Sequence, residues 1–476
     1  MLFNSLEFLI FLPTVFLLYW FVFQKNFKLQ NLTLLISSYI FYCWWDWRFL
    51  FLILLSSGIN YLAGILLANK NQKHKKAILK LSCGINIGIL GFFKYFSFFV
   101  DSLISACAVF GIHLQARTLN LVLPIGISFY TLKALSYTID VYKNKLEPTK
   151  DIIAFFSYLG YFPQLLAGPI DRAINLLPQF HVKRTFECDK AADGMRQILW
   201  GFFKKIVIAD SCAVYVNQIF AGYETLPAST LALGAVYFAF QIYGDFSGYS
   251  DIAIGTSRLF GFSSGPNFSA PYFSRDIAEF WRRWHISLTA WFREYLYIPL
   301  GGNRGTKTQV VRNTFIVFLL CGIWHGANWT FVAWGFINAL YVLPLLLLRK
   351  NRRHTDSVAS GKILPNVQEL LEMLITFALV VLGWIFFRAD SVGQAVAYIE
   401  RLFSNTLLSN PVGSGAELIL PVIALMVIIE WLQRDKTHGL ESLKLPFLLR
   451  WFVYDCIIVS VLWFIGREQP FIYFKF

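Results

Sequence analysis

Residues 370–387 read LLEMLITFALVVLGWIFF, a run of 18 residues in which Glu372 is the one charged side chain. A helix needs about 18 or more such residues to cross a hydrocarbon core that is roughly 30 Å thick. A helix in the core of a soluble domain does not need so long an apolar stretch. This run therefore predicts a transmembrane helix.

Further apolar runs recur along the chain. They lie at Glu7–Phe23, Asn31–Trp47, Phe49–Leu67, Leu231–Tyr243, Val332–Leu348, Leu418–Trp431 and Phe447–Ile465. Hydrophobic residues make up 57% of the 476 residues and charged residues 15%, whereas a soluble domain has about 45–50% and about 25%. The composition predicts an all-α polytopic integral membrane protein that has membrane lipid as a partner.

The formal net charge of +14 has the sign expected of a nucleic-acid-binding domain, but its distribution argues against that partner. The lysines and arginines cluster in short segments between apolar runs, as in cytoplasmic loops. The clusters are Lys25 and Lys28; Lys70, Lys73, Lys75 and Lys76; and Arg349, Lys350, Arg352 and Arg353. Two apolar runs separate the first cluster from the second, so both lie on one side and the N-terminus is predicted to lie outside.

The chain reads as one membrane domain, 1–476, without a repeat of solenoid period. Residues 1–123 and 339–476 hold plain apolar spans, whereas 124–338 mixes glycine, proline and charge with aromatic residues. Broken backbone at membrane depth is tolerated only where it is buried in protein or lines a wet cavity, so the central region is predicted to hold the site. The seven cysteines include no Cys-x-x-Cys pair and indicate neither a disulfide framework nor a metal site.

The stretch Trp281–Tyr295 has the periodicity of an amphipathic helix. Its apolar arc consists of Trp281, Trp284, Leu288, Trp291, Phe292 and Tyr295, and Arg283, Ser287 and Glu294 lie opposite. His285 falls at the margin of the apolar arc, so its imidazole is expected to face protein or membrane. Such a helix suits the membrane interface or the wall of a polar cavity.

His325 lies between two apolar runs and is flanked by Gly322 and Gly326. An ionisable side chain at membrane depth is costly and indicates function, although a buried core histidine in a helix break is the alternative. Imidazole is well matched to taking a proton from an attacking hydroxyl at neutral pH. Asn328 and Trp329 are expected to share a helix face with His325 and to line or orient the site.

Asp245 and Asp251 bound a glycine-rich stretch that follows an apolar run. They are candidates for binding substrate or orienting His285, or else for pairing with Arg258, Arg282 or Arg283. The other histidines fall in polar connecting stretches and are interpreted as solvated loop residues. They are His74, His113, His181, His354 and His438.

Three stretches resemble the signature of the membrane-bound O-acyltransferases, in character closest to the alginate O-acetyltransferase branch. They are Phe280-Trp-Arg-Arg-Trp-His-Ile-Ser-Leu288, Phe292-Arg-Glu-Tyr-Leu-Tyr-Ile-Pro-Leu-Gly-Gly302 and Gly322-Ile-Trp-His-Gly-Ala-Asn-Trp329. The resemblance covers essentially the whole chain. Lys133 departs from the pattern, since relatives often carry Gln there.

The resemblance implies roughly eleven or more transmembrane helices, with short tilted, re-entrant and interfacial helices, around a central tunnel. It implies His325 and His285 as catalytic residues, with Trp324, Trp284, Arg283, Asn328, Asp245 and Asp251 as substrate-binding or lining candidates. Acetyl-CoA is the implied donor, with no bound cofactor or metal. The implied acceptor is a polysaccharide or peptidoglycan, reached through a periplasmic partner of the SGNH-hydrolase type from the bacterial inner membrane.

Two other functions stay open at this point. D-alanyl transfer to teichoic acid uses a related membrane protein. A transporter or exporter of lipid-linked sugar is suggested by the charged, Gly/Pro-broken centre, but no internal repeat is present in the sequence.

Overall fold

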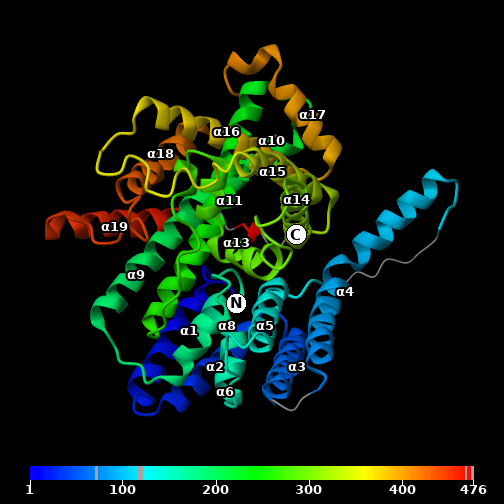
Figure 1. Ribbon diagram of the computed structural model, residues 1–476. Helices are drawn as coiled ribbons and strands as arrows, with labels where there is room; N and C mark the ends of the chain where they lie inside the picture. Colours follow the sequence, from blue (N-terminus) through cyan, green and yellow to red (C-terminus); the bar gives the residue numbers. More distant parts are fainter. Residues whose placement is uncertain (70–72, 115–121, 467–468, 473–476) are drawn as a thin grey trace. The chain divides into compact units, whose positions relative to one another are not determined.

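The computed structural model describes residues 1–69, 73–114, 122–466 and 469–472, and over these ranges the chain forms helices and no strand (Figure 1). The all-α prediction is confirmed. Five described helices are long and apolar enough to cross a membrane: Trp47–Ala68, Lys75–Val109, Trp329–Leu347, Val367–Arg388 and Phe447–Phe464. The count of eleven or more spans is not confirmed and stays a prediction.

The chain divides into two compact units. The first comprises 1–191 and 256–264, and the second comprises 192–255 and 265–476. The first unit contains α1 (Leu6–Leu17), η1 (Leu18–Val22), α2 (Phe27–Cys43), η2 (Trp47–Phe49), α3 (Leu50–Ala68), α4 (Lys75–Val109), α5 (Ile127–Tyr142), α6 (Ile152–Gly160), α7 (Phe162–Leu165), α8 (Ala173–Leu176) and η3 (Leu177–His181).

Helix α4 is one of these five helices, but the predicted apolar runs do not include it, because polar residues interrupt its sequence. In the structure these residues face α3 and α5. The Asn60 amide oxygen accepts hydrogen bonds from Ser82 Oγ at 3.1 Å and Thr138 Oγ1 at 2.7 Å. Asn86 Oδ1 accepts from Ser56 Oγ at 2.8 Å. Such side chains join helices in lipid by hydrogen bonding. The polar residues of α4 therefore contribute to helix packing.

The second unit holds the region that the sequence singled out. Its elements are α9 (Cys188–Phe202, mostly in this unit), η4 (Phe203–Ala209), α10 (Asp210–Ala221), α11 (Ala228–Leu259, up to Gly255), η5 (Pro271–Phe273), α12 (Ile277–Arg283), α13 (Ile286–Phe292), η6 (Arg293–Tyr297), α14 (Lys307–His325), α15 (Trp329–Leu347), α16 (Val367–Arg388), α17 (Val392–Leu402), η7 (Asn405–Leu408), α18 (Ala416–Leu432) and α19 (Phe447–Phe464).

Helices α14 and α15 pack along each other and are joined by a three-residue link. Two glycines permit this close approach. A side chain on Gly322 would collide with the backbone of Phe331, and one on Gly335 would collide with that of Phe318. The pair therefore places His325, the last residue of α14, against the start of α15.

Candidate active site

Both candidate histidines line one cavity of about 260 Å³ in the second unit. Its lining is mostly apolar and aromatic. The other lining residues are Trp281, Trp284, Leu288, Thr289, Phe292, Arg293, Tyr297, Asn303, Thr314, Val317, Phe318, Cys321, Leu346, Asn351 and Arg352. The structure therefore brings together two histidines that lie 40 positions apart in the sequence.

His325 ends α14, and the backbone becomes extended at Gly326. The imidazole is buried and stands nearly perpendicular to two aromatic rings, with ring centroids 5.1 Å from Trp334 and 5.3 Å from Phe387. These rings exclude water from one side of the imidazole. The helix break that belonged to the alternative interpretation of His325 thus lies directly after this residue.

Asn328 does not share a helix face with His325, because α14 has already ended. It is the N-cap of α15, where its side-chain oxygen accepts from the Thr330 backbone N–H at 3.0 Å. Its amide nitrogen donates to the Asp390 carbonyl at 3.1 Å. Trp329 is exposed. These contacts correct the expected placement of Asn328 and Trp329.

The predicted continuous helix Trp281–Tyr295 is wrong, because it breaks at His285. Helix α12 ends at Arg283 and α13 begins at Ile286, while His285 has φ 42° and ψ 56°. This left-handed conformation is uncommon for a residue with a side chain and costs on the order of 1–3 kcal/mol. Such strain often marks functional sites. The Ile286 N–H donates to the Asn267 carbonyl at 2.9 Å and holds the break in place.

Asn267 also fixes the imidazole of His285. His285 Nδ1 lies 3.1 Å from Asn267 Oδ1, and the Ser287 hydroxyl donates to the same oxygen at 2.8 Å. The Asn267 amide nitrogen in turn donates to Ser250 Oγ at 3.0 Å. Since an amide oxygen only accepts hydrogen bonds, neutral His285 must carry its proton on Nδ1 and its lone pair on Nε2.

The two candidate tryptophans differ in how they contact the histidines. The Trp324 ring centroid lies 5.0 Å from His325 and 6.2 Å from His285, so Trp324 contacts both. Trp284 lines the cavity and packs against Trp384 at 4.9 Å. Both indoles are buried, and Trp324 is the one that packs against both imidazoles.

A second cavity of about 930 Å³ adjoins the first. Six residues line both cavities: Arg293, Tyr297, Asn303, Leu346, Asn351 and Arg352. The lining of the second cavity includes five basic side chains and no acidic one. They are Arg293, Arg304, Lys307, Arg349 and Arg352. We call this cavity the basic vestibule. Part of its wall is Gly301–Lys307, a glycine-rich stretch that lacks the order of a phosphate-binding loop.

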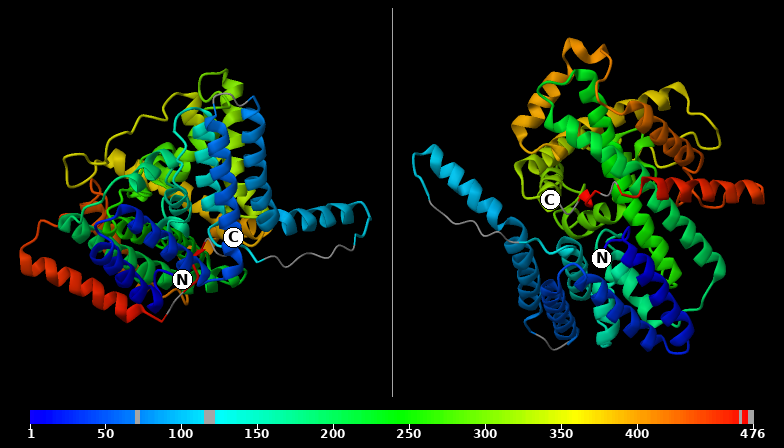
Figure 2. Two further views of the ribbon diagram at one scale, coloured as in Figure 1. Left: turned by 90° about the horizontal axis from the view of Figure 1, so that it is seen from below. Right: turned by 180° about the vertical axis from the view of Figure 1, so that it is seen from behind.

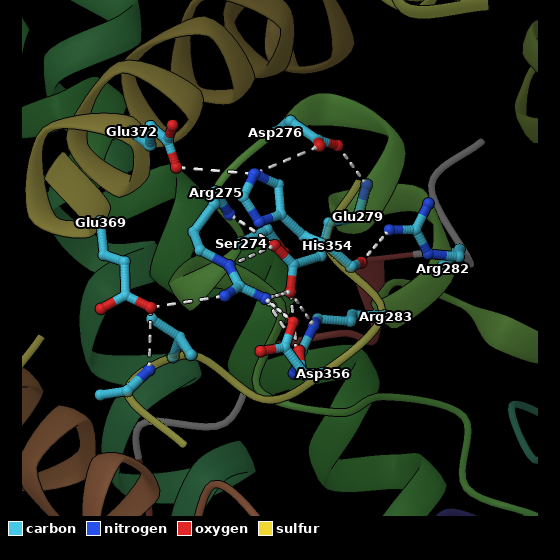
Figure 3. A network of polar contacts seen from close by, with 12 residues as sticks. Ser274, Arg275, Asp276, Glu279, Arg282, Arg283, His354, Asp356, Glu369 and Glu372 are labelled. Carbon is cyan, nitrogen blue, oxygen red and sulfur yellow. Dashed lines mark hydrogen bonds and ion pairs between the residues drawn. The ribbon is translucent and has the colours of Figure 1, made fainter. Parts of the chain in front are cut away.

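A polar network joins α12 to the loop that carries His354 and Asp356 (Figure 3). Arg282 donates to the Asn351 carbonyl at 2.6 Å and to the His354 carbonyl. Arg275 donates to the Asp356 carbonyl at 2.8 Å and pairs with Glu279 at 3.2 Å. The loop that carries Asn351 and Arg352 is therefore anchored to the helix that leads into His285.

Arg283 lies in this network rather than in the cavity, because its guanidinium donates to Glu279 Oε1 at 2.8 Å. Asp356 is a mostly exposed member of the network and lies outside the spans. Its slight burial raises the pKa of the carboxyl, but the hydrogen bonds and positive charge of Arg275 outweigh this effect and lower the pKa below its ordinary value. Deprotonated Asp356 therefore favours the anchored loop.

Asp245 and Asp251 do not line the cavity of the two histidines. Asp245 pairs with Lys205 at 2.8 Å, and Lys205 also pairs with Asp210 at 2.7 Å. Asp251 pairs with Lys204 at 2.6 Å. We call these five residues the lysine–aspartate cluster. The two lysines come from η4, and the sequence pattern does not indicate them as partners of these aspartates.

The lysine–aspartate cluster holds a segment near the end of the chain. Asp245 Oδ2 accepts from the Ile472 N–H at 2.6 Å, and Lys205 donates to the Gln469 carbonyl at 3.0 Å. Phe471 is fully buried, with its ring 4.5 Å from that of Tyr249. The cluster therefore has a clear packing role.

His438 differs from the expectation of a solvated loop residue. Its side chain is buried, and Nε2 lies 3.3 Å from Asp193 Oδ1. His354 is partly buried in the network of Figure 3, where Nε2 lies 3.5 Å from Glu372 Oε2. Neither histidine lines the cavity.

Sequence reasoning missed Asn267 and the basic vestibule. Asn267 follows Gly265 and Pro266, and nothing in this turn-forming stretch indicates a contact with a histidine 18 positions later. The vestibule has a signal in the sequence, because Arg349 and Arg352 belong to a basic cluster, but such a cluster by itself predicts topology and not a binding site.

Comparison with known proteins adds an independent finding. The model of MBOAT, the membrane-bound O-acyltransferase family, matches residues 146–383, which include both cavity histidines. A Pseudomonas aeruginosa protein described as "Probable alginate O-acetylase AlgI" is 41% identical over 407 residues, covering 85% of this chain and 75% of the relative. The peptidoglycan O-acetyltransferase of Helicobacter pylori is 32% identical, covering 100% and 98%. The teichoic acid D-alanyltransferase of Bacillus subtilis is 28% identical, covering 56% and 69%.

Proposed function

Because the chain belongs to the membrane-bound O-acyltransferase family, we propose that it passes an acetyl group from acetyl-CoA towards hydroxyls of an exported or cell-wall polysaccharide. Membership makes the chain a membrane-embedded O-acyltransferase. The similar proteins named for O-acetylation of alginate and peptidoglycan support the acetyl group and the polysaccharide acceptor.

The observation that carries the proposal is the placement of His285 and His325 in one cavity beside the basic vestibule. Acyl transfer needs a proton acceptor at the reacting hydroxyl and a site for the donor. Aromatic walls exclude competing water, which would otherwise hydrolyse the thioester. The cavity and the vestibule can supply these needs side by side.

In the proposed reaction the hydroxyl oxygen of the acceptor attacks the thioester carbonyl carbon while His325 takes the hydroxyl proton. The carbon–oxygen bond forms, the carbon–sulfur bond breaks, and the proton passes from His325 to the departing sulfur. General-base catalysis of this kind contributes roughly 10²–10⁴-fold. The reaction leaves the protonation of His325 unchanged.

His285 has a different proposed role. With Nδ1–H directed at Asn267, the lone pair on Nε2 accepts one hydrogen bond from a substrate N–H or O–H. That hydrogen bond would position a reactant beside His325. We therefore assign to His285 the orientation of substrate and to His325 the removal of the proton.

The basic vestibule is the proposed binding place of the phosphates of acetyl-CoA. Arginine guanidinium groups bind phosphate bidentately, and Lys307 adds a point charge. The pantetheine arm would then lead the thioester past Arg352 and Asn351 towards the histidines. The cluster at Arg349 has the charge of a cytoplasmic loop, which supports entry of the donor from the cytoplasm.

The location and partners are part of the proposal. We place the protein in a bacterial inner membrane with its N-terminus outside, on the basis of the charge pattern of its loops. A periplasmic transferase of the SGNH type would pass the acetyl group to the final polysaccharide. D-alanyl transfer to teichoic acid is the alternative acyl transfer, because a D-alanyltransferase is among the similar proteins.

The test uses membranes from a host that lacks its own copy and expresses the full chain together with its native polysaccharide and its SGNH-type periplasmic transferase. Labelled acetyl-CoA is added, and alkali-labile label in the polysaccharide is counted. We expect label with the wild-type chain and a loss of roughly 10²–10⁴-fold with His325→Ala. Normal labelling by a folded His325→Ala variant contradicts the catalytic role. Labelling by D-alanine and not by acetyl-CoA selects the alternative.

A further inference from the structure

Helix α19 carries a carboxylate at the middle of an apolar span. The helix has 18 residues, Phe447–Phe464, and is one of the five that are long and apolar enough to cross a membrane. Asp455 lies near its centre, about 13 Å from either end at 1.5 Å per residue. In Figures 1 and 2 the helix projects beyond the other elements of the second unit.

The helix turns one side to the protein, where it packs against η4. Ile457 is buried on this side. The partly buried residues of the helix share this arc: Arg450, Val453, Tyr454, Ser460, Val461 and Phe464. At 100° per residue, Asp455 points about 160° away from Ile457. Its carboxylate is exposed and therefore faces the lipid side.

The exposed side has a regular pattern. Leu448, Phe452, Asp455, Val459 and Leu462 follow one another at alternating steps of four and three residues. The four apolar members are 80%, 63%, 62% and 63% exposed, in chain order. This spacing is the heptad seam along which two helices pack with knobs in holes. We call these five residues the α19 seam.

Lipid alone is an unfavourable environment for the α19 seam, because the seam contains a carboxylate. A charged side chain at the centre of the bilayer is costly, and such residues almost always face protein, water or a partner group. Among the residues that the structure describes, none forms a hydrogen bond or ion pair with Asp455. Helix association in lipid depends on packing and on interhelical hydrogen bonds, and the α19 seam offers both.

We propose that the α19 seam is a homodimer interface, in which α19 packs in parallel against α19 of a second copy. All copies insert with the same orientation, so a two-fold axis along the membrane normal brings each seam residue to its equivalent at the same depth. Asp455 then meets Asp455 of the second copy, and the two carboxyl groups can share a proton in a hydrogen bond. A single polar residue in a heptad seam also fixes register.

We assign the partner of the α19 seam as a second copy of this chain. Across the two-fold axis each apolar residue of the seam packs against its equivalent, and Asp455 meets Asp455. A different membrane protein would have to supply a hydrogen-bonding side chain at the depth of Asp455. That occupant is the competing outcome of the experiment below.

The first test counts copies of the full-length protein in nanodiscs by single-molecule photobleaching. We expect two copies for the wild type and one copy for Asp455→Leu, with dimerisation weakened about tenfold or more. Leucine removes a charge from a lipid-facing position, so the variant keeps its span. Asp455→Asn retains hydrogen bonding and should stay dimeric. A monomeric wild type, or a dimeric Asp455→Leu variant, overturns the proposal.

The second test locates the interface by disulfide cross-linking in a Cys188→Ser, Cys456→Ser background, since both of these native thiols are exposed. Val459→Cys places a thiol in the seam, and Ile457→Cys places one on the side that faces η4. Cross-linked dimer is expected from Val459→Cys and not from Ile457→Cys. Equal cross-linking at both positions, or none at Val459, contradicts a seam centred on Asp455.

Discussion

The cavity of the two histidines and the lysine–aspartate cluster lie in the same unit, and both come from the part of the sequence that is richest in unusual residues. The cavity has aromatic walls and two buried imidazoles. The cluster has five buried charged side chains that form two groups of ion pairs, Lys204 with Asp251 and Lys205 with Asp210 and Asp245, at 2.6–2.8 Å. Both regions hold polar side chains inside a membrane protein, where burial of such groups is costly. The cluster offsets this cost by ion pairing, whereas the cavity holds its imidazoles among aromatic rings.

This difference indicates a structural role for the lysine–aspartate cluster and a chemical role for the cavity. Charges that pair inside protein neutralise one another, and removing one leaves its partner buried and uncompensated. An imidazole can remain neutral in an aromatic environment and still accept a proton from a reactant. We therefore expect the cavity to determine the rate of transfer and the cluster to determine the stability of the fold.

The largest effect is expected at His325. Replacing His325 with alanine should lower the rate of acyl transfer roughly 10²–10⁴-fold, because the proton acceptor is lost. The thermal midpoint should change little by comparison. His438→Ala is the matched control, since His438 is also buried but lies outside the cavity. Equal losses of activity in the two variants would remove the special role of His325.

The next largest effect is expected at Lys205, on stability rather than on chemistry. Lys205→Met leaves Asp210 and Asp245 buried without their cation, and breaking such a pair costs about 3–5 kcal/mol. Denaturant unfolding in detergent measures the loss. Lys190→Met, which breaks an exposed pair with Glu187, serves as control and should change stability by less than about 1 kcal/mol. A fully stable Lys205→Met variant would show that the cluster does not maintain the fold.

Asn267 provides a sharper probe of the cavity. Asn267→Ala removes the hydrogen bond that orients His285, and a loss of about 1.4 kcal/mol corresponds to about tenfold in rate. Ser287→Ala removes another donor from the same oxygen without touching His285 and should have a smaller effect. The measurement is the transfer rate of each folded variant. A Ser287→Ala variant that is slower than Asn267→Ala would contradict the proposal that Asn267 acts by orienting His285.

The basic vestibule should affect the binding of the donor rather than the chemical step. Arg352→Ala is expected to raise the KM for acetyl-CoA about twofold to fivefold with kcat nearly unchanged, since Arg352 is exposed. Arg353→Ala is the neighbouring control, because Arg353 pairs with Glu372 and does not line the vestibule. An equal rise in KM for both variants would indicate a general effect of charge.

The smallest effect is expected at Asp356. The lowered pKa of Asp356 means that its pairing with Arg275 contributes stability above the ordinary carboxyl pKa and loses it as the pH falls through the lowered value. Asp356→Asn should therefore lower the free energy of unfolding by less than about 1 kcal/mol near neutral pH, and by nothing in strong acid. Unfolding curves of both proteins over the acidic range measure this difference. A difference that grows as the pH falls would contradict the assignment.

The candidate site could be predicted from the sequence because the residues that mark each histidine lie next to it in the chain. His325 stood between two apolar runs and two glycines, and the structure places it at the end of α14, before a short break. The aromatic character around His285 was also visible in the sequence. Apolar composition alone was enough to predict the all-α membrane fold.

The remaining features depend on contacts between distant residues. A continuous helix wheel over Trp281–Tyr295 could not anticipate the break at His285, because Asn267 holds it from outside the segment. Helix α4 is absent from the predicted apolar runs because polar residues interrupt its sequence. In the structure these residues form hydrogen bonds with one another across three helices. The pairing of Asp251 with Lys204 joins residues 47 positions apart.

Chemical rescue with imidazole is the most direct test of His325 as the base. The His325→Ala variant is assayed for labelled acetyl transfer in native membranes with and without added imidazole, alongside Lys205→Met. If His325 is the base, imidazole should restore part of the transfer by His325→Ala in a concentration-dependent way and should not help Lys205→Met. A folded His325→Ala variant that transfers acetyl at the wild-type rate without imidazole would contradict the claim that His325 is the base.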